Sequence, residues 1–193
     1  RKRSEPRLLE ESAQLISIMR DKSPADISAL MHISDELAHL NATRYADFTA
    51  EHTARNARPA VLAFNGDVYQ GLSARTLSER DLTEAQKTVR VLSGLYGVLR
   101  PLDLIQPHRL EMGTRLDTPR GRSLYDWWGD RVTDLLRQDL DDSPGSDVLI
   151  NLASQEYFAA VRPERLGARV ISPRFEDRDQ HGEPRVVSFY AKR

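Results

Sequence analysis

The sequence predicts a single α/β domain of mixed α+β character, with a mixed sheet surrounded by helices. Several segments carry apolar residues at three- and four-residue steps, which is the period of amphipathic helices. Two short apolar runs, residues 60–64 and 148–152, end at turn residues and indicate strands covered on both faces. A later pair of apolar segments flanks a polar stretch, which is typical of a hairpin. A chain of 193 residues is long enough to bury one sizeable core.

The composition is that of an ordinary globular protein, and it excludes several classes of site. Hydrophobic residues make up 39% of the chain, charged residues 30%, and the net charge is −1, so bulk charge does not indicate nucleic-acid binding. The absence of cysteine excludes disulfides, thiol catalysis and cysteine-ligated metals. No run is long and apolar enough to cross a bilayer, and no signal-peptide pattern begins the chain. We expect a cytoplasmic protein without a membrane partner.

The N-terminal part predicts three helices and a loop. One apolar stripe indicates a surface helix over residues 6–22. Ser23 and Pro24 supply a serine N-cap and a proline at the first helical position, so a second, short helix begins there. Ser34 can cap a third helix, and the polar residues 49–58 indicate a loop.

The rest of the chain alternates helices with short strands. The middle predicts a strand at 60–64, a turn at 65–67, at most one helical turn at 68–72, a helix at 78–92, a strand at 109–112 and a loop at 118–121. The C-terminal part predicts a helix from Ser123 to about 140, a break at 141–145, a strand at 148–152, a short helix after Ser154, and an antiparallel hairpin of 170–171 with 186–190. Since the chain begins without methionine and still resembles a strand where it ends, we expect a fragment of a longer protein.

The segment 92–103 is the centre of the predicted organisation. Gly94 and Gly97 bracket two apolar residues, which describes a tight turn whose backbone approaches another group closely. That group is either another part of the protein or a phosphate. Arg90 and Arg100 stand on either side, so an anion would find positive charge and free N–H groups together.

A second signal is a set of polar groups at the ends of the predicted strands, where α/β proteins build their sites. The candidates are Asp67, Tyr69, Tyr96, Glu111, Asn151, Ser154, Glu156, Tyr157 and Lys192. If the strands are neighbours, these groups converge with Arg100 on one cleft, in which Asp67 or Glu156 can act as a base. The alternative is that Asn151 and Ser154 only cap a helix and the tyrosines fill the core.

Metal binding has little support in the sequence. Glu36 and His39 have the Glu-x-x-His spacing of di-iron helical bundles, and His32 precedes them. Such a site needs two motifs of this kind, and Ser34 is expected to interrupt the helix between His32 and Glu36. His108 and Glu111 lack the zinc-protease spacing. We therefore expect no metal and no cofactor.

Four separated motifs resemble the YaaA family, a group of bacterial proteins linked to peroxide-stress resistance. These are LSGLYGVLRPLDLIQPHRLEMG at 92–113, FNGDVYQGL at 64–72, INLASQEYF at 150–158 and SFYAKR at 188–193. The resemblance covers residues 1–193 as one domain. The family's N-terminal Ile-Ser-Pro-Ala-Lys strand and its C-terminal Ala-Arg-Gly region are absent here, which supports the expectation of a truncated chain.

The resemblance implies a protein that binds double-stranded or distorted DNA and limits damage linked to free intracellular iron. It also implies a helix-hairpin-helix, which maps best onto residues 86–102. Backbone donors of such a hairpin grip phosphate without reading bases, so binding is expected to be independent of sequence. The expected DNA-binding residues are Lys87, Arg90, Gly94, Gly97, Arg100, Arg109 and Arg115.

The rival hypothesis is an enzyme that acts on a nucleotide-like or nucleobase substrate. It would use Asp67, Glu111 and Glu156 as its acidic groups, with the other polar residues of the predicted cleft around the substrate. A solvated surface also explains the basic residues. The sequence names no protein partner.

Overall fold

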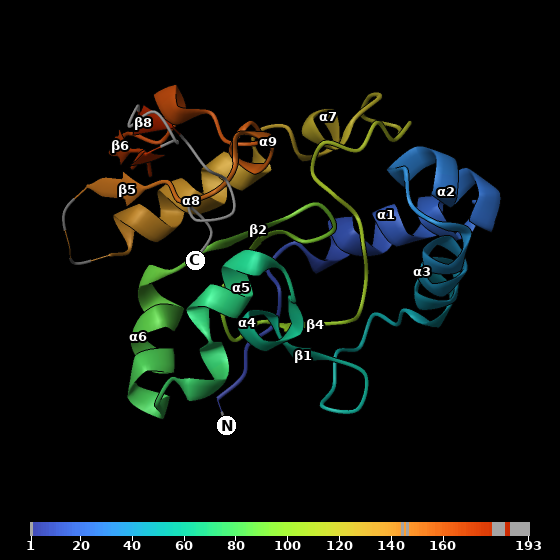
Figure 1. The fold of residues 1–193 in the computed structure, drawn as a ribbon, viewed down its shortest axis with the longest axis horizontal. Coiled ribbons are helices and arrows are strands. Elements are labelled where there is room, and N and C mark those ends of the chain that lie inside the picture. The colour runs from blue at the N-terminus through green and yellow to red at the C-terminus, as the bar shows by residue number, and fades with distance from the viewer. Residues whose placement is uncertain (1, 144, 146, 179–183, 186–193) are drawn as a thin grey trace.

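The structure is a computed structural model that describes residues 2–143, 145, 147–178 and 184–185 (Figure 1). Its helices are α1 (Leu9–Arg20), α2 (Pro24–Met31), α3 (Asp35–Asp47), α4 (Ala60–Ala63), α5 (Asp67–Leu72), α6 (Glu79–Thr88), α7 (Leu124–Trp128), α8 (Arg131–Asp141) and α9 (Gln155–Phe158), with 3-10 turns η1 (Ala74–Thr76) and η2 (Pro163–Arg165). Its strands are β1 (Arg58–Pro59), β2 (Val91–Ser93), β3 (Gly97–Leu99), β4 (Leu104–Ile105), β5 (Val148–Ile150), β6 (Arg169–Ile171), β7 (Asp177–Arg178) and β8 (Pro184–Arg185). The prediction of a mixed α/β fold is confirmed.

The strands form separate pairs. Antiparallel pairs join β1 to β4, β2 to β3 and β7 to β8, while β5 and β6 pair in parallel. The prediction of one mixed sheet is therefore wrong for the described residues. Each strand has only two or three residues, so the ladders are too short to join the pairs into one sheet.

The three N-terminal helices agree with the sequence because their caps are encoded locally. The hydroxyl of Ser23 accepts a hydrogen bond from the Asp26 N–H at 3.2 Å, and the Asp26 carboxylate accepts one from the Ser23 N–H at 2.9 Å. This reciprocal pair is a capping box, which stabilises the start of α2. Ser34 caps α3 by a single hydrogen bond, which its hydroxyl accepts from the N–H of Leu37. Figure 1 shows α1, α2 and α3 grouped at one end of the molecule.

Residues 60–64 are helical rather than extended, which corrects the predicted strand. The N–H of Phe64 donates to the carbonyl of Ala60 at 3.1 Å, closing the single turn of α4. The N–H groups of Ala60 and Val61, which a helix start leaves unpaired, donate to the carbonyls of Asp103 and Pro101. A short apolar run alone cannot distinguish a buried strand from a buried helical turn.

Two further predictions for the C-terminal half are wrong, and the hairpin of 170–171 with 186–190 stays a prediction. The helix from Ser123 to about 140 is broken into α7 and α8 at Gly129, whose φ of 52° is unfavourable for other residues. Residues 109–112 are irregular because no neighbouring strand pairs with them. Residues 170–171 belong to β6, whose partner is β5, and the predicted partner 186–190 lies outside the described residues.

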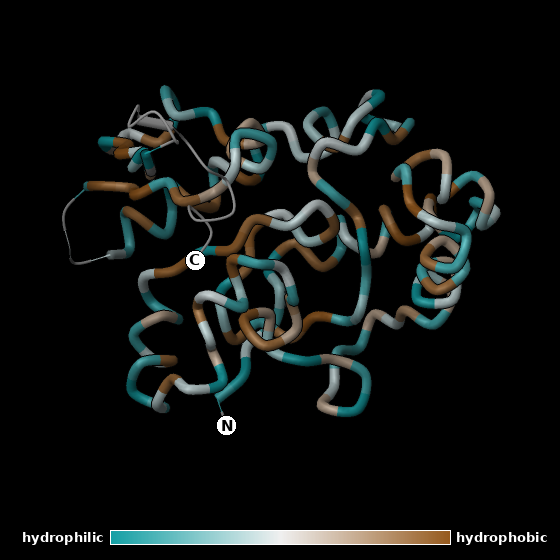
Figure 2. Tube along the Cα trace, viewed as in Figure 1, coloured by the Kyte–Doolittle hydropathy of each residue, from teal (hydrophilic) through white to brown (hydrophobic). Residues whose placement is uncertain are grey.

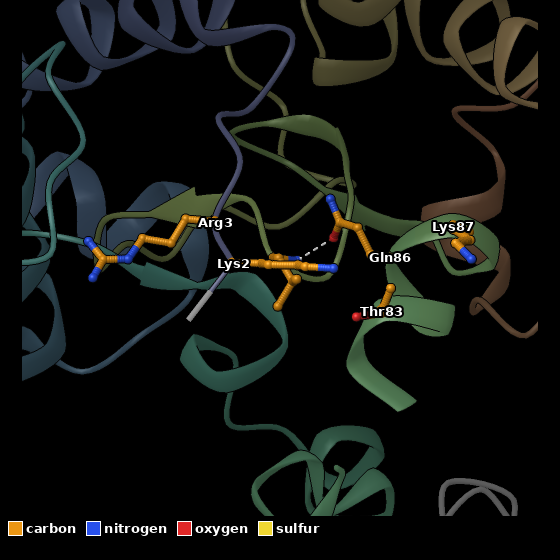
Figure 3. Close-up of a pocket in the computed structure, with 6 residues that line it drawn as sticks. Lys2, Arg3, Thr83, Gln86 and Lys87 are labelled. Carbon is orange, nitrogen blue, oxygen red and sulfur yellow. Dashed lines mark hydrogen bonds between the residues drawn. The ribbon is translucent and has the colours of Figure 1, made fainter. Parts of the chain in front are cut away.

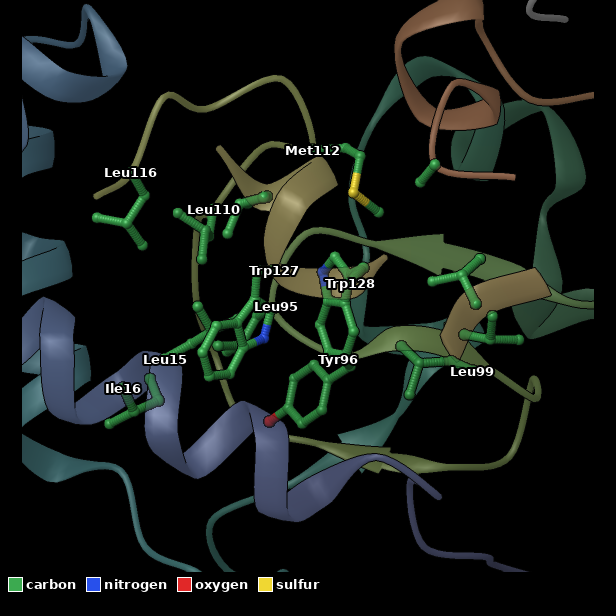
Figure 4. Packing of buried hydrophobic residues seen from close by; sticks show 14 of the residues in the cluster. Leu15, Ile16, Leu95, Tyr96, Leu99, Leu110, Met112, Leu116, Trp127 and Trp128 are labelled. Carbon is green, nitrogen blue, oxygen red and sulfur yellow. The ribbon is translucent and has the colours of Figure 1, made fainter. Parts of the chain in front are cut away.

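The core gathers around the segment 91–99, which we call the central hairpin. It consists of β2, the turn Gly94–Leu95–Tyr96 and β3. Figure 4 shows Leu95, Tyr96 and Leu99 of this hairpin among Trp127, Trp128 and residues of α1. Figure 2 shows hydrophobic residues along the central hairpin and α4, and more polar ones on the outer turns of α6. The chain's middle therefore lies in the interior.

The central hairpin is a β-hairpin, so the predicted helix-hairpin-helix over residues 86–102 is wrong. Helix α6 ends at Thr88, and β2 and β3 pair through Val91 with Leu99 and Ser93 with Gly97. The backbone does approach another group closely, as the two glycines indicated. A Cβ on Gly94 would lie 2.2 Å from the Leu110 carbonyl oxygen, and the indole Nε1 of Trp128 donates to the Gly94 carbonyl at 2.9 Å. The partner of the turn is the protein itself.

Replacing Gly97 with alanine should destabilise the fold more than the same change at Gly167. Both glycines have left-handed φ angles, 68° and 69°, which cost alanine about 1 kcal/mol. A Cβ at Gly97 would also lie 2.9 Å from Leu8 and 3.0 Å from Trp128, whereas nothing lies within 4 Å at Gly167. Overpacking adds about 1–3 kcal/mol, so urea unfolding should show Gly97→Ala as the more damaging variant by that amount. Equal losses at both positions would contradict this packing.

Candidate functional site

Arg90 is part of an internal ion-pair cluster rather than a free cation. Its Nε lies 2.5 Å from Asp139 Oδ2, and Arg7 grips the same carboxylate through both terminal nitrogens at 2.6 and 2.8 Å. The Arg90 and Asp139 side chains are only 17% and 14% exposed. Burial alone would raise the pKa of Asp139, but the hydrogen bonds and charges of Arg7 and Arg90 outweigh it and hold this pKa below its ordinary value. The cluster joins the end of α6 to α8.

Arg100 is likewise committed to the fold. Its guanidinium lies 3.1 Å from the carboxylate of Asp103, which is completely buried, and donates to the Glu5 carbonyl at 3.2 Å. The Arg100 N–H and the Ser4 hydroxyl donate to the same carboxylate at 2.8 and 2.6 Å. Together these bonds fasten the N-terminal segment beside the turn that follows the central hairpin.

Gly94 and Gly97 are buried, which leaves no room for a phosphate beside them. Of the seven residues expected at DNA, four thus stabilise the fold: Arg90, Gly94, Gly97 and Arg100. The other three lie on two surfaces. Lys87 lines a cavity beside the N-terminal segment, and Arg109 and Arg115 belong to the loop that follows β4.

The first surface, which we call the basic cavity, has a volume of about 360 Å³. It is lined by Lys2, Arg3, Thr83, Gln86, Lys87 and Leu102 (Figure 3). Three of these residues are cationic and none is acidic. Lys87 pairs with Glu84 at 3.0 Å, but both side chains are about 60% exposed (62% and 60%), so this pair is weak. The basic cavity therefore offers positive charge to an anion.

Gln86 explains why the N-terminal lysine lies against α6. Its side-chain nitrogen donates to the Ser4 hydroxyl at 2.9 Å, and its side-chain oxygen accepts from the Leu102 N–H at 2.7 Å. Figure 3 shows Lys2 extending toward Gln86 and Thr83, while Arg3 points in the opposite direction. Sequence reasoning missed Lys2 and Arg3, although consecutive basic residues at the start of the chain were a usable signal.

The second surface, which we call the mixed-charge groove, has a volume of about 340 Å³. It is lined by Leu30, Met31 and His32 at the end of α2, by Glu111, Gly113, Thr114 and Arg115 of the loop, and by Glu156 of α9. The structure thus brings together Glu111 and Glu156, as the cleft hypothesis expected. The three α2 residues were not found by sequence reasoning, since they join the groove only through tertiary packing.

Glu156 is held in place by backbone. Its Oε1 accepts a hydrogen bond from the Gly113 N–H at 2.9 Å, and a Cβ on Gly113 would lie 3.2 Å from the same oxygen. The Tyr125 hydroxyl donates to the Glu156 carbonyl at 2.9 Å. Glu111 pairs instead with Arg109, whose terminal nitrogen lies 2.6 Å from Glu111 Oε1.

Two half-buried tyrosines have raised pKa values, and one of them, Tyr157, is influenced by these carboxylates. Burial raises the pKa of Tyr157 to about 12, and the charges of Glu156 and Glu111 act in the same direction. Burial also raises the pKa of Tyr69 to about 12, with a contribution from Tyr157. The ring of Tyr69 stacks on Phe64 with centroids 5.1 Å apart. Both phenols stay protonated near neutral pH and can donate hydrogen bonds.

The remaining candidates of the predicted cleft lie elsewhere. Asp67 is exposed at the first position of α5 and does not line the groove. Asn151 accepts from the Ala153 N–H at 2.9 Å, and Ser154 caps α9, which is the structural role that the sequence left open. Tyr96 is completely buried, where its hydroxyl lies 3.0 Å from His52 Nε2. Lys192 lies outside the described residues.

The described residues contain neither a cluster of metal-ligating side chains nor a helix that could span a membrane. In that part of the chain, no group of three or more histidine, aspartate or glutamate side chains could hold a metal ion. His32 instead ends α2 with a left-handed φ of 52°. Within the same residues, no helix combines the length and apolar character that a bilayer crossing requires.

Comparison with known proteins gives a consistent result over the whole chain. Residues 1–193 match the family described as "Peroxide stress protein YaaA". The chain is 56% identical over 190 residues to a UPF0246 protein of Tolumonas auensis, and this match covers 98% of the chain and 72% of that relative. A UPF0246 protein of Cupriavidus metallidurans is 57% identical over 190 residues, covering 97% of the chain and 72% of the relative. One from Ralstonia nicotianae is 59% identical with the same coverage, 97% and 72%.

Replacing Asp139 with asparagine should destabilise the protein by about 2 kcal/mol at neutral pH, because two arginines lose their shared carboxylate. The pKa of Asp139 is lowered in the folded state, so its contribution is complete above the unfolded value of about 4 and is lost as the pH falls further. Urea unfolding of the parent protein and of Asp139→Asn, repeated between neutral and acidic pH, measures this difference in the free energy of unfolding.

The matched control for this prediction is Asp141→Asn, since Asp141 is an exposed residue of the same helix. It should change the free energy of unfolding by less than about 0.5 kcal/mol. If Asp139→Asn and Asp141→Asn behave alike at every pH, the cluster does not stabilise the fold.

Proposed function

Because the chain belongs to the YaaA family of peroxide stress proteins, also named UPF0246, we propose that it binds DNA without sequence specificity at the basic cavity. The observation that supports this proposal is the lining of that cavity, which includes Lys2, Arg3 and Lys87 and no acidic side chain. Glu84, which pairs with Lys87 at 3.0 Å, lies outside this lining. Cations that contact phosphate oxygens supply affinity that is independent of base sequence. Double-stranded or distorted DNA in the cytoplasm is the proposed partner.

Helix α6 extends the cationic surface. Arg80, Thr83, Glu84 and Lys87 lie at positions i, i+3, i+4 and i+7, so two cations, one hydroxyl and one carboxylate share one face of the helix. Arg80 is exposed and has no ion pair within the described part of the chain. This spacing lets α6 follow a phosphate backbone while Lys2 contacts it from the side.

The proposed link to iron is indirect. Free iron that is bound to DNA as a counterion produces damaging radicals at the backbone when it meets peroxide. A protein that neutralises phosphates releases their counterions, so binding at the basic cavity would displace iron from the DNA it covers. This proposal needs no metal site in the protein.

A second candidate function is an enzyme that acts on a nucleotide-like or nucleobase substrate. One observation favours it, namely that Glu111 and Glu156 line one groove. The charges of both carboxylates also help to keep the Tyr157 hydroxyl protonated. Carboxylates repel the phosphates of duplex DNA, so this groove is separate from the proposed DNA surface. Glu156→Gln should therefore leave the binding of duplex DNA unchanged.

Binding of a labelled duplex, followed by fluorescence anisotropy over a salt series, tests the DNA proposal. The logarithm of the association constant should fall linearly with the logarithm of salt concentration, and Lys2→Ala and Lys87→Ala should each make the slope shallower by about 1. Glu84→Gln should strengthen binding, because it removes the anion beside Lys87. Arg122→Ala, at an exposed arginine of the 118–122 loop, is the control and should change nothing. Absence of salt-dependent binding would refute the proposal.

A further inference from the structure

The mixed-charge groove holds an anion and a cation that are not paired with one another. Glu156 and Arg115 both line it, and no ion pair joins them. Arg115 is exposed and has no hydrogen bond or ion pair from its guanidinium among the described residues. A ligand that fits between the two side chains must therefore offer donors to one of them and acceptors to the other.

Glu156 is the acceptor that remains available in this groove. Its Oε1 is anchored from behind by the Gly113 N–H at 2.9 Å, and its second carboxylate oxygen has no described donor. Glu111 differs, because the Arg109 guanidinium already lies 2.6 Å from its Oε1. The positions of both carboxylates are set by the protein before a ligand arrives, which lowers the entropy cost of binding.

The walls of the groove are apolar on one side. Leu30 and Met31, at the end of α2, face the groove, and Met31 is otherwise buried at 7% exposure. Leucine and methionine side chains suit the flat face of an aromatic ring, since methionine sulfur and methyl groups contact rings favourably. The volume of about 340 Å³ is sufficient for a purine with its sugar.

We propose that the mixed-charge groove binds a guanine base, with Glu156 accepting from its N1–H and N2–H groups and Arg115 donating to O6 and N7. Guanine presents these two donors and two acceptors on adjacent edges, and arginine to O6 and N7 is the commonest specific contact to this base. Adenine in the same position would direct its N6 amino group toward the arginine and the lone pair of its N1 toward the carboxylate, so it offers a donor to the cation and an acceptor to the anion. This inference rests on the second candidate function and names the ligand of that groove.

Nucleosides test the inference without interference from the basic cavity, because they carry no phosphate. We expect guanosine to bind more tightly than adenosine by about tenfold, as isothermal titration calorimetry would measure. Inosine lacks the N2 amino group, so it should bind more weakly through loss of the Glu156 contact. 7-Deazaguanosine lacks the N7 acceptor, so it should bind more weakly through loss of the Arg115 contact.

Variants assign each contact to its residue. Glu156→Gln should weaken guanosine binding about tenfold and abolish the preference over inosine, while keeping the preference over 7-deazaguanosine. Arg115→Ala should also weaken guanosine binding, but it should abolish the preference over 7-deazaguanosine and keep the preference over inosine. Glu164→Gln and Arg55→Ala, at exposed residues outside the groove, are the matched controls and should bind guanosine as the parent protein does. Unchanged thermal melting of each variant verifies that it folds.

The guanine can come from a free nucleoside or from an unpaired position in DNA. Three duplexes distinguish these sources: one with a single bulged guanine, one with a single bulged adenine and one without a bulge. The affinity of each duplex is measured for the parent protein and for Glu156→Gln. If the parent protein prefers the bulged guanine and Glu156→Gln loses this preference, the source is unpaired DNA. If guanosine binds but the bulged guanine is not preferred, the source is the free nucleoside. Either result supports the groove as a guanine site.

Equal affinity for guanosine and adenosine, or affinities that neither variant changes, would overturn the inference. Chromatography of the nucleoside after incubation tests the second candidate function separately. Intact guanosine that nevertheless binds would support the guanine site and contradict the enzyme. Binding of duplex DNA through Lys87 is decided independently by the salt series.

Discussion

The close approach of the Gly94 turn to the segment around Leu110 is the constraint on which the rest of the structure depends. A side chain at Gly94 would overlap the Leu110 carbonyl, and one at Gly97 would press on Leu8 and Trp128. The Trp128 indole donates to the Gly94 carbonyl, and the buried Tyr96 hydroxyl accepts the Gln106 N–H at 3.1 Å. The segment before α1, the helix α7 and the loop after β4 therefore meet on one hairpin, so that close packing of the core fixes their relative positions.

The residues of both candidate surfaces are positioned by segments that lie next to this hairpin in the sequence or pack against it. The loop that leaves Leu110 carries Glu111 and Arg115, and the Gly113 N–H of the same loop orients Glu156 of α9. On the other side, the Asp103 carboxylate and Gln86 hold the N-terminal segment, which brings Lys2 to α6. The charged side chains that the sequence offers as ligand contacts thus form two groups. Some stabilise the fold through internal ion pairs, and the others are exposed to solvent on the two surfaces.

The sequence was sufficient for the helix caps, which neighbouring residues encode. The caps at Ser23, Ser34 and Ser154 were predictable because an N-cap hydroxyl bonds to an N–H three residues on. The helical turn at 60–64 was not predictable, since its first N–H groups are satisfied by Asp103 and Pro101, forty residues away. The partners of Arg90 and Arg100 were both missed. Asp139 reaches Arg90 only through the packing of α8, and Asp103, although only three residues from Arg100, was not recognised as its partner.

The two surfaces differ in the ligand chemistry that each can accept. A phosphodiester has only acceptor oxygens and negative charge, so it gains from the basic cavity and is repelled by an exposed carboxylate. A base edge has donors as well as acceptors, so a carboxylate becomes favourable once its partner supplies N–H groups. Glu156, kept in place by a backbone N–H and left without a cationic partner, costs affinity for a polyanion and contributes to affinity for a base. Its presence with Arg115 in the mixed-charge groove therefore favours a base over a phosphodiester as the ligand of that groove.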